Sequence, residues 1–261
     1  MLRRLLIILF YWERRINIKL RVSNFTQQYE GMPIIEDVSF YLQEDEFVTL
    51  IGPSGCGKST IFNMIAGIVP IDEGKVSIDG EDCTGKIGQV SYMYQKDLLL
   101  PWKRVIDNTA LPLIIKGDSI KEARKKIIPY LALFGLEGFE YKYPAQLSGG
   151  MRQRAALLRT YMFSKDIVLL DEPFGGLDAI TRSKMQYWLL EVADQVRASV
   201  LFITHDIEEA IYLSDRIYVL TERPARVREE VAISLPRPRA REIVTSAQFN
   251  RIKKHILFSL S

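Results

Sequence analysis

The sequence predicts an α/β fold in which buried parallel strands alternate with helices and a helical segment is inserted. Three apolar runs, at 47–51, 167–171 and 200–204, have the length and composition of strands buried on both faces of a sheet. A helix-like segment at 180–196 separates the last two runs, as in a strand–helix–strand unit. Between residues 98 and 164 the spacing of apolar residues becomes helical.

The elements ahead of the insertion are short. Apolar side chains recur at every second residue at Ile18, Leu20 and Val22, which is the period of a half-buried strand. The helix that follows the 47–51 strand is expected to end at Gly67, because glycine commonly follows the last turn of a helix. The expected strands and helix span, in chain order, residues 17–22, 38–42, 47–51, 58–66, 75–78 and 88–94.

Helix signals mark the insertion itself. Ser119 is placed to cap the N-terminus of a helix with its hydroxyl, and Gly135 ends the pattern. Between these two residues apolar side chains recur with helical spacing, at Ile120, Ala123, Ile127, Ile128 and Leu131. The 261 residues are therefore expected to form one core with an inserted helical region.

Composition excludes several classes of protein. With 48% apolar and 26% charged residues, the chain is neither disordered nor collagen-like, and it can bury a core without disulfides. Its two cysteines, Cys56 and Cys83, are too few for a disulfide framework, so we expect a reducing compartment. The net charge of +3 is too small to indicate nucleic-acid binding.

Residues 1–15 have no assigned role. They contain an apolar run of eight residues, from Leu5 to Trp12, flanked by arginine pairs. A spanning helix needs about 20 apolar residues, and no stretch of the sequence reaches that length. A surface-lying helix and extra residues ahead of the true start are both compatible with this run.

The other end of the chain is basic. Residues 221–261 hold nine Lys or Arg against four Glu, which we interpret as a solvated basic tail. Within it, Pro236 and Pro238 interrupt the arginine-rich segment at 237–241. That segment is therefore expected to be an exposed connector rather than a regular helix or an anion site.

A glycine-rich loop follows the 47–51 strand and opens a helix. Its sequence, GPSGCGKST, fits the phosphate-loop pattern GxxxxGK[ST]. Glycines let successive backbone N–H groups point at phosphate oxygens, and the helix N-terminus favours an anion. Lys58 is expected to reach the β- and γ-phosphates, and the Ser59 hydroxyl to bind Mg²⁺. The candidate nucleotide-binding residues of the loop are Gly52, Pro53, Ser54, Gly55, Cys56, Gly57, Lys58, Ser59 and Thr60.

Two carboxylates end the 167–171 run. Asp171 and Glu172 are expected at the carboxyl edge of a parallel sheet, which is where ligands bind in open α/β folds. Asp171 is suited to hold Mg²⁺ through its water shell, and Glu172 to orient or deprotonate an attacking water. Two acids after a strand can also be simple charges at a helix N-terminus, but the phosphate loop favours the site interpretation.

A second glycine-rich element lies at LSGGMRQR. Ser148 is a candidate helix N-cap with Gly149 and Gly150 beside it, so backbone N–H groups and a helix N-terminus are again offered to an anion. Arg152 and Arg154 lie close by in the sequence. Either both glycine-rich elements grip one nucleotide in the same chain, or the second serves a nucleotide held by a partner chain.

Together these motifs resemble those of the ATP-hydrolysing subunits of ABC transporters. GPSGCGKST resembles the family's Walker A motif, IVLLDEP its Walker B motif and LSGGMRQR its signature motif. Gln95 in SYMYQ matches the Q-loop glutamine, Asp178 lies in the D-loop match, and His205 in ITHD matches the switch histidine. The resemblance covers about residues 17–225, with the motifs in the family's order.

The resemblance implies a fold more specific than α/β alone. It implies a P-loop NTPase core with an N-terminal antiparallel β subdomain and an inserted helical subdomain. The ATPase domain would span 16–225, with the helical subdomain at about 97–164 and a basic C-terminal tail at 226–261. Asp45 stands where the family commonly has glycine, and we expect little effect because Asp tolerates left-handed backbone.

The resemblance also implies residue roles toward ATP and Mg²⁺. Tyr29 matches the aromatic residue that stacks on adenine, with Phe25 as an alternative. Gln95 would reach Mg²⁺ and the attacking water, and His205 would contact the γ-phosphate. The catalytic residues would be Glu172, His205 and Gln95, and the Mg²⁺ ligands Ser59, Gln95 and Asp171.

A head-to-tail dimer follows from the same resemblance. Ser148, Gly149 and Gly150 of one subunit, with Asp178, would close on ATP held by Lys58 of a second ATPase subunit, expected to be a copy of this chain. Binding of ATP would close the dimer and hydrolysis would reopen it, and the motion would drive integral-membrane permease subunits. Trp102 would either face the permease or fill the core of the helical subdomain.

Within the family, LLLPW, FGGLDAITR and THDIEEAI look most like the importers of nitrate, sulfonate or taurine. The resemblance then implies a peripheral subunit on the cytoplasmic face of the cell membrane, with a separate solute-binding protein and no nucleic acid. A soluble ABC-type ATPase acting on DNA or ribosomes is an alternative, although such proteins usually carry long insertions. A P-loop kinase is a second alternative, and the signature motif argues against it.

Overall fold

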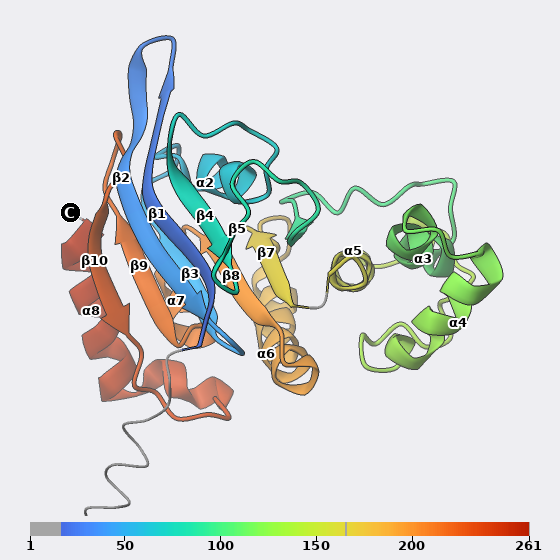
Figure 1. Cartoon of the computed structure of the whole chain (residues 1–261). Coiled ribbons are helices and arrows are strands. Elements are labelled where there is room, and N and C mark those ends of the chain that lie inside the picture. The colour runs from blue at the N-terminus through green and yellow to red at the C-terminus, as the bar shows by residue number, and fades with distance from the viewer. Residues whose placement is uncertain (1–16, 165, 261) are drawn as a thin grey trace, which may run out of the picture.

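The computed structural model describes residues 17–164 and 166–260, so the unassigned segment 1–15 lies outside the described residues. Two sheets, with helices around them, form the body of the protein (Figure 1). The first is a four-stranded antiparallel sheet in the order β2-β1-β4-β5. Its strands are β1 (Ile18–Tyr29), β2 (Met32–Gln43), β4 (Glu73–Ile78) and β5 (Glu81–Asp82).

The second sheet has six strands in the order β10-β9-β3-β8-β7-β6. The five strands from β9 to β6 run parallel, and β10 is antiparallel to β9 at the edge. The apolar runs at 47–51 and 167–171 match two of these strands residue for residue. The strands are β3 (Phe47–Ile51), β6 (Ser91–Met93), β7 (Ile167–Asp171), β8 (Ser199–Thr204), β9 (Arg216–Leu220) and β10 (Val227–Ala232).

The central strands are apolar on both faces because each face packs against a different layer. Leu50 and Leu169 join one buried cluster with the antiparallel sheet and α2 (Lys58–Ile65). Ile51 and Leu170, one residue further along, join the other cluster with the helices of the opposite face. Those helices are α6 (Ala179–Val196), α7 (Ile207–Leu213) and α8 (Ala247–Leu260).

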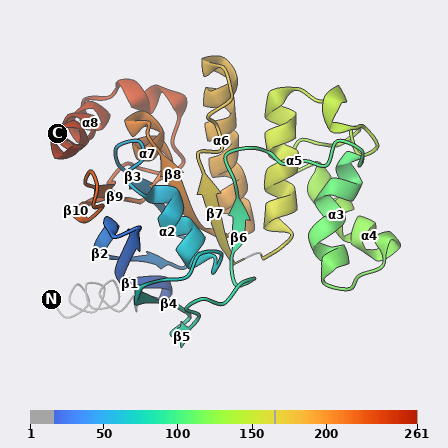
Figure 2. The same cartoon turned by 90° about the horizontal axis from the view of Figure 1, so that it is seen from above.

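The insertion forms a separate group of helices beside the sheet (Figure 2). Ser119 caps α4 as predicted, because its hydroxyl accepts a hydrogen bond from the backbone N–H of Glu122 at 3.2 Å. Trp188 of α6 meets Phe134 edge to face at 5.8 Å and so ties the insertion to the core. The insertion contains α3 (Val105–Ile115), α4 (Ile120–Leu131), the short 3-10 helix η1 (Pro144–Gln146) and α5 (Gly149–Tyr161).

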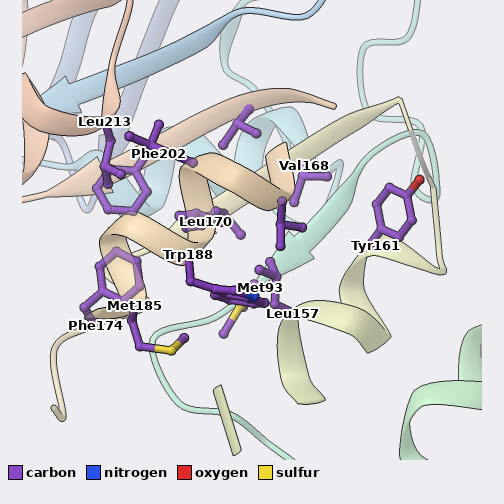
Figure 3. Packing of buried hydrophobic residues seen from close by; sticks show 14 of the residues in the cluster. Met93, Leu157, Tyr161, Val168, Leu170, Phe174, Met185, Trp188, Phe202 and Leu213 are labelled. Atoms are coloured by element: carbon purple, nitrogen blue, oxygen red, sulfur yellow. The ribbon is translucent and has the colours of Figure 1, made fainter. Parts of the chain in front are cut away.

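A continuous apolar layer joins α5 and α6 to the sheet (Figure 3). Leu157 of α5, Trp188 of α6 and Leu170 of β7 are all buried in it, with Met93 of β6. This packing holds the helical insertion against the strands that carry the candidate site. The predicted fold class, an α/β P-loop core with an antiparallel β subdomain and a helical insertion, is confirmed.

The expectation of a solvated C-terminal tail is wrong. Residues 227–232 form β10 of the main sheet, and the 3-10 helix η2 (Arg241–Thr245) and α8 continue the fold. Phe249 and Ile256 of α8 are fully buried. Arg251 and Lys254 of α8 are exposed, which is why charge alone suggested a tail.

The arginine-rich segment at 237–241 is the expected exposed connector at each position except Arg239. Arg239 is only 3% exposed, and its Nη1 donates to the carbonyls of Ile211 and Tyr212 at the C-terminus of α7. Arg237 pairs with Asp215 at 2.9 Å. Free helix carbonyls attract cations, so Arg239 lies against the core, whereas Arg237 stays exposed.

Truncation of Phe249 tests whether α8 is part of the folded core. We expect Phe249→Ala to lower the free energy of unfolding by about 3–5 kcal/mol, because it leaves a cavity in a buried cluster. Phe258→Ala on the same helix is the matched control, since Phe258 is 69% exposed and its truncation should change stability little. Urea denaturation followed by circular dichroism measures both, and equal midpoints for the two variants would contradict a docked α8.

Three smaller expectations can be compared with the structure. Asp45 has φ of 56°, so it adopts the left-handed backbone expected of it. Trp102 is 70% exposed, which rules out the interpretation that it fills the core of the insertion. The strand expected at 88–94 is confined to Ser91–Met93, the three residues that pair with β7. In the part of the chain that the structure describes, no helix combines the length and apolar character that crossing a membrane requires.

Candidate functional site

The candidate site lies at the carboxyl edge of the parallel strands. The phosphate loop follows β3, Asp171 and Glu172 end β7, and His205 follows β8. Strands β3 and β7 both pair with β8, so the three segments emerge side by side. Residues far apart in the sequence meet here because parallel strands present the same end at one edge.

The phosphate loop connects β3 to α2 through residues with unusual backbone. Gly55 and Gly57 have φ of 76° and 126°, in the region that favours glycine. A Cβ at Gly57 would lie 3.3 Å from side-chain atoms of Ile34 and Ile35, so a larger residue would also meet the β2 strand. The loop sequence therefore fixes both the turn and its close packing.

Lys58 is held inside the loop. Its ammonium donates to the carbonyls of Gly52 and Pro53 at 2.7 and 2.9 Å, and the residue is 6% exposed. Arg223, from the segment after β9, donates to the carbonyl of Gly55 at 2.5 Å. The N–H of Cys56 donates to the carbonyl of Pro53 at 3.2 Å. With the loop carbonyls bonded on one side, the remaining N–H groups can face an anion on the other side, as in an anion nest.

Asp171 is a buried carboxylate at the end of β7. Burial raises its pKa, and hydrogen bonds from Ser59 and Tyr92 oppose that rise. The Tyr92 hydroxyl donates to Oδ2 at 3.3 Å. A cation beside a buried carboxylate stabilises the charged form of that carboxylate. Hydroxyl, carboxylate and amide oxygens are ligands that Mg²⁺ accepts, so the donors offered by Ser59, Asp171 and Gln95 fit this ion.

Glu172 lies between two other predicted site residues. Its Oε1 is 3.1 Å from Nδ1 of His205, and its Oε2 accepts a hydrogen bond from Nε2 of Gln95 at 3.2 Å. Glu172 has φ of 44°, a left-handed backbone that is uncommon for a glutamate and is found at functional turns. The sequence placed these three residues 77 and 33 positions apart, and the fold brings them into contact.

The signature motif lies elsewhere in the chain. Ser148 caps α5 and accepts a hydrogen bond from the N–H of Met151 at 3.3 Å. A Cβ on Gly150 would meet Thr181 at 3.2 Å, so this glycine packs against the first turn of α6. Both views place α5 away from α2, which follows the phosphate loop (Figures 1 and 2). The structure therefore does not bring the two glycine-rich elements together within one chain.

Asp178 and Tyr29 occupy exposed positions. Asp178 caps α6 and accepts from the N–H of Thr181 at 3.0 Å, and these hydrogen bonds lower its pKa. Tyr29 ends β1 and is 47% exposed, whereas Phe25 is fully buried. Phe25 is therefore not available to stack on a base, and Tyr29 is the remaining candidate of the pair.

Sequence reasoning missed several polar residues that support the site. Tyr92 bonds to Asp171, and Arg223 bonds to the phosphate loop. Thr204 and Glu209 form a buried hydrogen bond beside His205. Tyr92 and Thr204 lie in apolar strand patterns, where a single polar residue gives no signal of its partner. The contacts of Tyr92 and Arg223 join segments that are distant in the sequence, so only the fold reveals them.

The fold and the loop together define a class of protein. A glycine-rich phosphate loop between a buried parallel strand and a helix, with acids at the end of another parallel strand two positions along the same sheet, is the arrangement of P-loop nucleotide hydrolases. Within that class the chain belongs to the ABC transporter family, whose model matches residues 35–175. It is an ABC transporter ATPase.

Relatives and solved structures agree with this family. The aliphatic sulfonates import ATP-binding protein SsuB of Bacillus cereus is 40% identical over 233 residues, which cover 89% of this chain and 90% of the relative. The taurine import ATP-binding protein TauB of Rhizobium johnstonii is 41% identical over 227 residues, covering 85% and 87%. A solved dimeric structure of MJ0796, a bacterial ABC transporter cassette, matches with a TM-score of 0.70 at 31% identity, covering 83% of this chain and all of that one. A dimeric post-hydrolysis state of the same cassette, bound to ADP and Pi, matches with a TM-score of 0.69 at 30% identity. This match also covers 83% of this chain and all of the cassette.

Proposed function

We propose that this chain hydrolyses ATP to drive a membrane importer for a small anionic or zwitterionic solute such as nitrate, a sulfonate or taurine. The observation that carries the ATPase part is the contact of Glu172 with both His205 and Gln95 at the edge of the sheet that also holds the phosphate loop. The solute class rests on the sulfonate and taurine import relatives, which are similar over most of this chain.

The phosphate loop holds the phosphates of ATP in this proposal. The N–H groups between Gly52 and Thr60 face the β-phosphate, and Lys58 exchanges the loop carbonyls for the β- and γ-phosphates. Ser59, Asp171 and Gln95 hold Mg²⁺. The ion supplies charge neutralisation on the phosphate oxygens. Tyr29, exposed at the end of β1, stacks on the adenine.

Glu172 is the general base of the proposed reaction. Its carboxylate accepts a proton from the attacking water, and the water oxygen forms a bond to the γ-phosphorus while the bond to the β–γ bridging oxygen breaks. Gln95 orients this water through its amide, and His205 contacts the γ-phosphate. The products are ADP and inorganic phosphate.

A second subunit completes each site. Because Ser148, Gly149 and Gly150 lie on α5, away from the phosphate loop of their own chain, we assign them to ATP held by Lys58 of a second copy packed head to tail. Asp178, at the N-terminus of α6, lies at the same interface. The dimeric state of the MJ0796 cassettes supports this arrangement.

An apolar groove between the core and the insertion is the proposed docking site for the permease. The groove encloses about 470 Å³. Large apolar side chains line it with unusual exposure, among them Ile87 at 73% and Ile115 at 78%. Ile115 ends α3, and Trp102 lies in the segment that leads into that helix. A permease that is docked here holds the chain at the cytoplasmic face of the membrane, and a separate solute-binding protein supplies the solute.

Replacing one groove residue tests the docking site. We expect Ile115→Asp to weaken association with the permease by about tenfold or more, because it places a charge in an apolar interface. Ile120→Asp is the matched control, since Ile120 is 57% exposed on α4 and does not line the groove. ATP binding by the free chain should be unchanged in both. Co-purification with the permease measures the difference, and equal recovery of the two variants would place the interface elsewhere.

The intact complex tests the function as a whole. Purified with its permease in vesicles, the chain should release inorganic phosphate from ATP faster when the solute and its binding protein are present. Sulfonates, taurine and nitrate are assayed in parallel to identify the solute class. Tight ATP-dependent binding to DNA or ribosomes, or a phosphorylated small molecule in place of free phosphate, would favour the alternative functions.

A further inference from the structure

His205 sits in a turn that a buried threonine closes. The Thr204 hydroxyl accepts a hydrogen bond from the N–H of Asp206 at 3.0 Å, which links the residues on both sides of His205. The same hydroxyl donates to Oε2 of Glu209 at 2.6 Å. Thr204 is 2% exposed, so its hydroxyl has no access to bulk solvent. The hydroxyl that closes the turn around His205 therefore also bonds to a glutamate four residues beyond that histidine.

Glu209 is a buried carboxylate that the proposed hydrolysis does not use. It lies on α7 and is 6% exposed. Its other oxygen, Oε1, accepts a hydrogen bond from Nε2 of Gln186 on α6 at 3.0 Å. Nε of Arg182, also on α6, lies 3.8 Å from Oε1, a charge contact that is longer than a hydrogen bond. Both of these contacts come from α6, the helix that Asp178 caps.

Arg182 extends the link to the segment before α6. Its Nη2 donates to the carbonyl of Leu177 at 3.1 Å, and Leu177 directly precedes Asp178. A path of polar contacts thus runs from residues 177–178 through Arg182 and Glu209 to Thr204 and the turn at His205, and its step from Arg182 to Glu209 is the 3.8 Å charge contact. The path joins two segments of the candidate site that are 27 residues apart in the sequence.

A buried carboxylate lowers the stability of a fold, so its presence calls for another reason. Moving a charge out of water costs several kcal/mol, and an apolar pair of similar volume is often at least as stable. Burial raises the pKa of Glu209, and its partners on α6 and β8 offset that effect only in part. A polar link with fixed donors, however, specifies one geometry, and misplacement of a catalytic group by about 1 Å can lower a rate about 100-fold.

We propose that Glu209 is a positioning residue for His205, and that the link from Arg182 through Glu209 to Thr204 couples the orientation of His205 to residues 177–178. The proposal rests on the proposed function in two respects, the assignment of His205 to the ATPase site and the head-to-tail dimer. In the head-to-tail dimer, residues 177–178 lie at the subunit interface, so the link gives His205 a connection to the partner subunit.

Two substitutions break the link with little change in volume. Thr204→Val keeps the β-branched shape and removes the hydroxyl, whereas Thr204→Ser keeps the hydroxyl and is the conservative rescue. Glu209→Gln places amide N–H groups opposite donors of Gln186 and Arg182. Glu208→Gln is the matched control, because Glu208 is the neighbouring acid on α7 but is exposed and pairs with Lys253.

We expect Thr204→Val and Glu209→Gln to lower kcat for ATP hydrolysis about tenfold or more, with KM for ATP changed less than about twofold. We expect kcat to change more than KM because the substitutions misplace His205 and leave the phosphate loop unchanged. Thr204→Ser and Glu208→Gln should retain the wild-type kcat. If Thr204→Val and Glu209→Gln affect kcat no more than Glu208→Gln does, the proposal is wrong.

A spectroscopic readout separates positioning from loss of stability. The chain has two histidines, so histidine-selective ¹³C labelling gives two ring signals, and His255→Gln identifies that of His205. The His205 signal should move in Thr204→Val and Glu209→Gln and stay in place in Thr204→Ser and Glu208→Gln. A lowered kcat with an unmoved His205 signal would overturn the proposal. If the wild-type chain hydrolyses no ATP, the proposed function fails, and the ring signals still decide whether the link positions His205.

Discussion

Glu172→Gln is expected to lower the rate of ATP hydrolysis by about 100-fold or more while ATP still binds, because the amide cannot accept the proton of the attacking water. The side chain of Glu172 is 21% exposed, and its carboxylate contacts both His205 and Gln95. Glutamine has the same size and can keep a hydrogen bond to Gln95. The substitution therefore removes the base and preserves the shape of the site.

Phosphate release under saturating ATP and Mg²⁺ measures this rate, and equilibrium binding of labelled ATP measures affinity. Glu137→Gln is the control, since Glu137 is an exposed acid in the insertion and should behave as wild type. Unchanged turnover in Glu172→Gln would remove this residue from the role of base. A loss of ATP binding would instead show that Glu172 holds the nucleotide.

Lys58→Met is expected to weaken ATP binding by about 100-fold, because a charged hydrogen bond to phosphate contributes up to about 3 kcal/mol. Methionine matches most of the length of the buried stem and carries no charge. The ammonium of Lys58 now bonds to two loop carbonyls, so its loss also leaves those carbonyls without their donor. We expect the effect to appear in the dissociation constant for ATP.

Calorimetric titration with ATP measures this affinity directly. Lys121→Met is the matched control, because Lys121 is exposed on α4 and far from the loop in sequence and fold. Without nucleotide, Lys58→Met should unfold at a lower temperature than Lys121→Met, because two loop carbonyls lose their donor, so both titrations are made well below the two unfolding midpoints. Equal affinity for ATP in both would contradict the assignment of the loop as the phosphate site.

The sequence predicted those parts of the fold whose cause is local. The continuous apolar runs at 47–51 and 167–171 became β3 and β7, because strands buried on both faces need apolar residues at every position. Ser119 caps α4 through its own hydroxyl, which is a contact within four residues. The phosphate loop was recognisable because one short segment contains the whole motif.

The rest of the fold depended on contacts between distant segments. The basic C-terminal residues looked solvated, yet α8 docks through Phe249 and Ile256, two apolar residues that a charge count does not weigh. Arg239 is buried because the end of α7 offers it free carbonyls. No pattern within residues 236–241 shows that those carbonyls are near.

The candidate site divides in the same way. Glu172, Gln95 and His205 were predicted from motif order, and the parallel sheet brings them together. Ser148 and its glycines were predicted to serve ATP, and within one chain they lie apart from the phosphate loop. The link through Glu209 was not predicted, because neither Thr204 nor Glu209 departs from an ordinary strand or helix pattern.

The central claim is that ATP joins two copies of this chain, with the phosphate loop of one facing Ser148 of the other. The most direct test is the mass of the Glu172→Gln chain by sedimentation, measured with and without saturating ATP and Mg²⁺. We predict a monomer without nucleotide and a dimer with it, and no dimer when Lys58→Met is added. A Glu172→Gln chain that binds ATP and remains monomeric, both alone and with its permease, would contradict the claim.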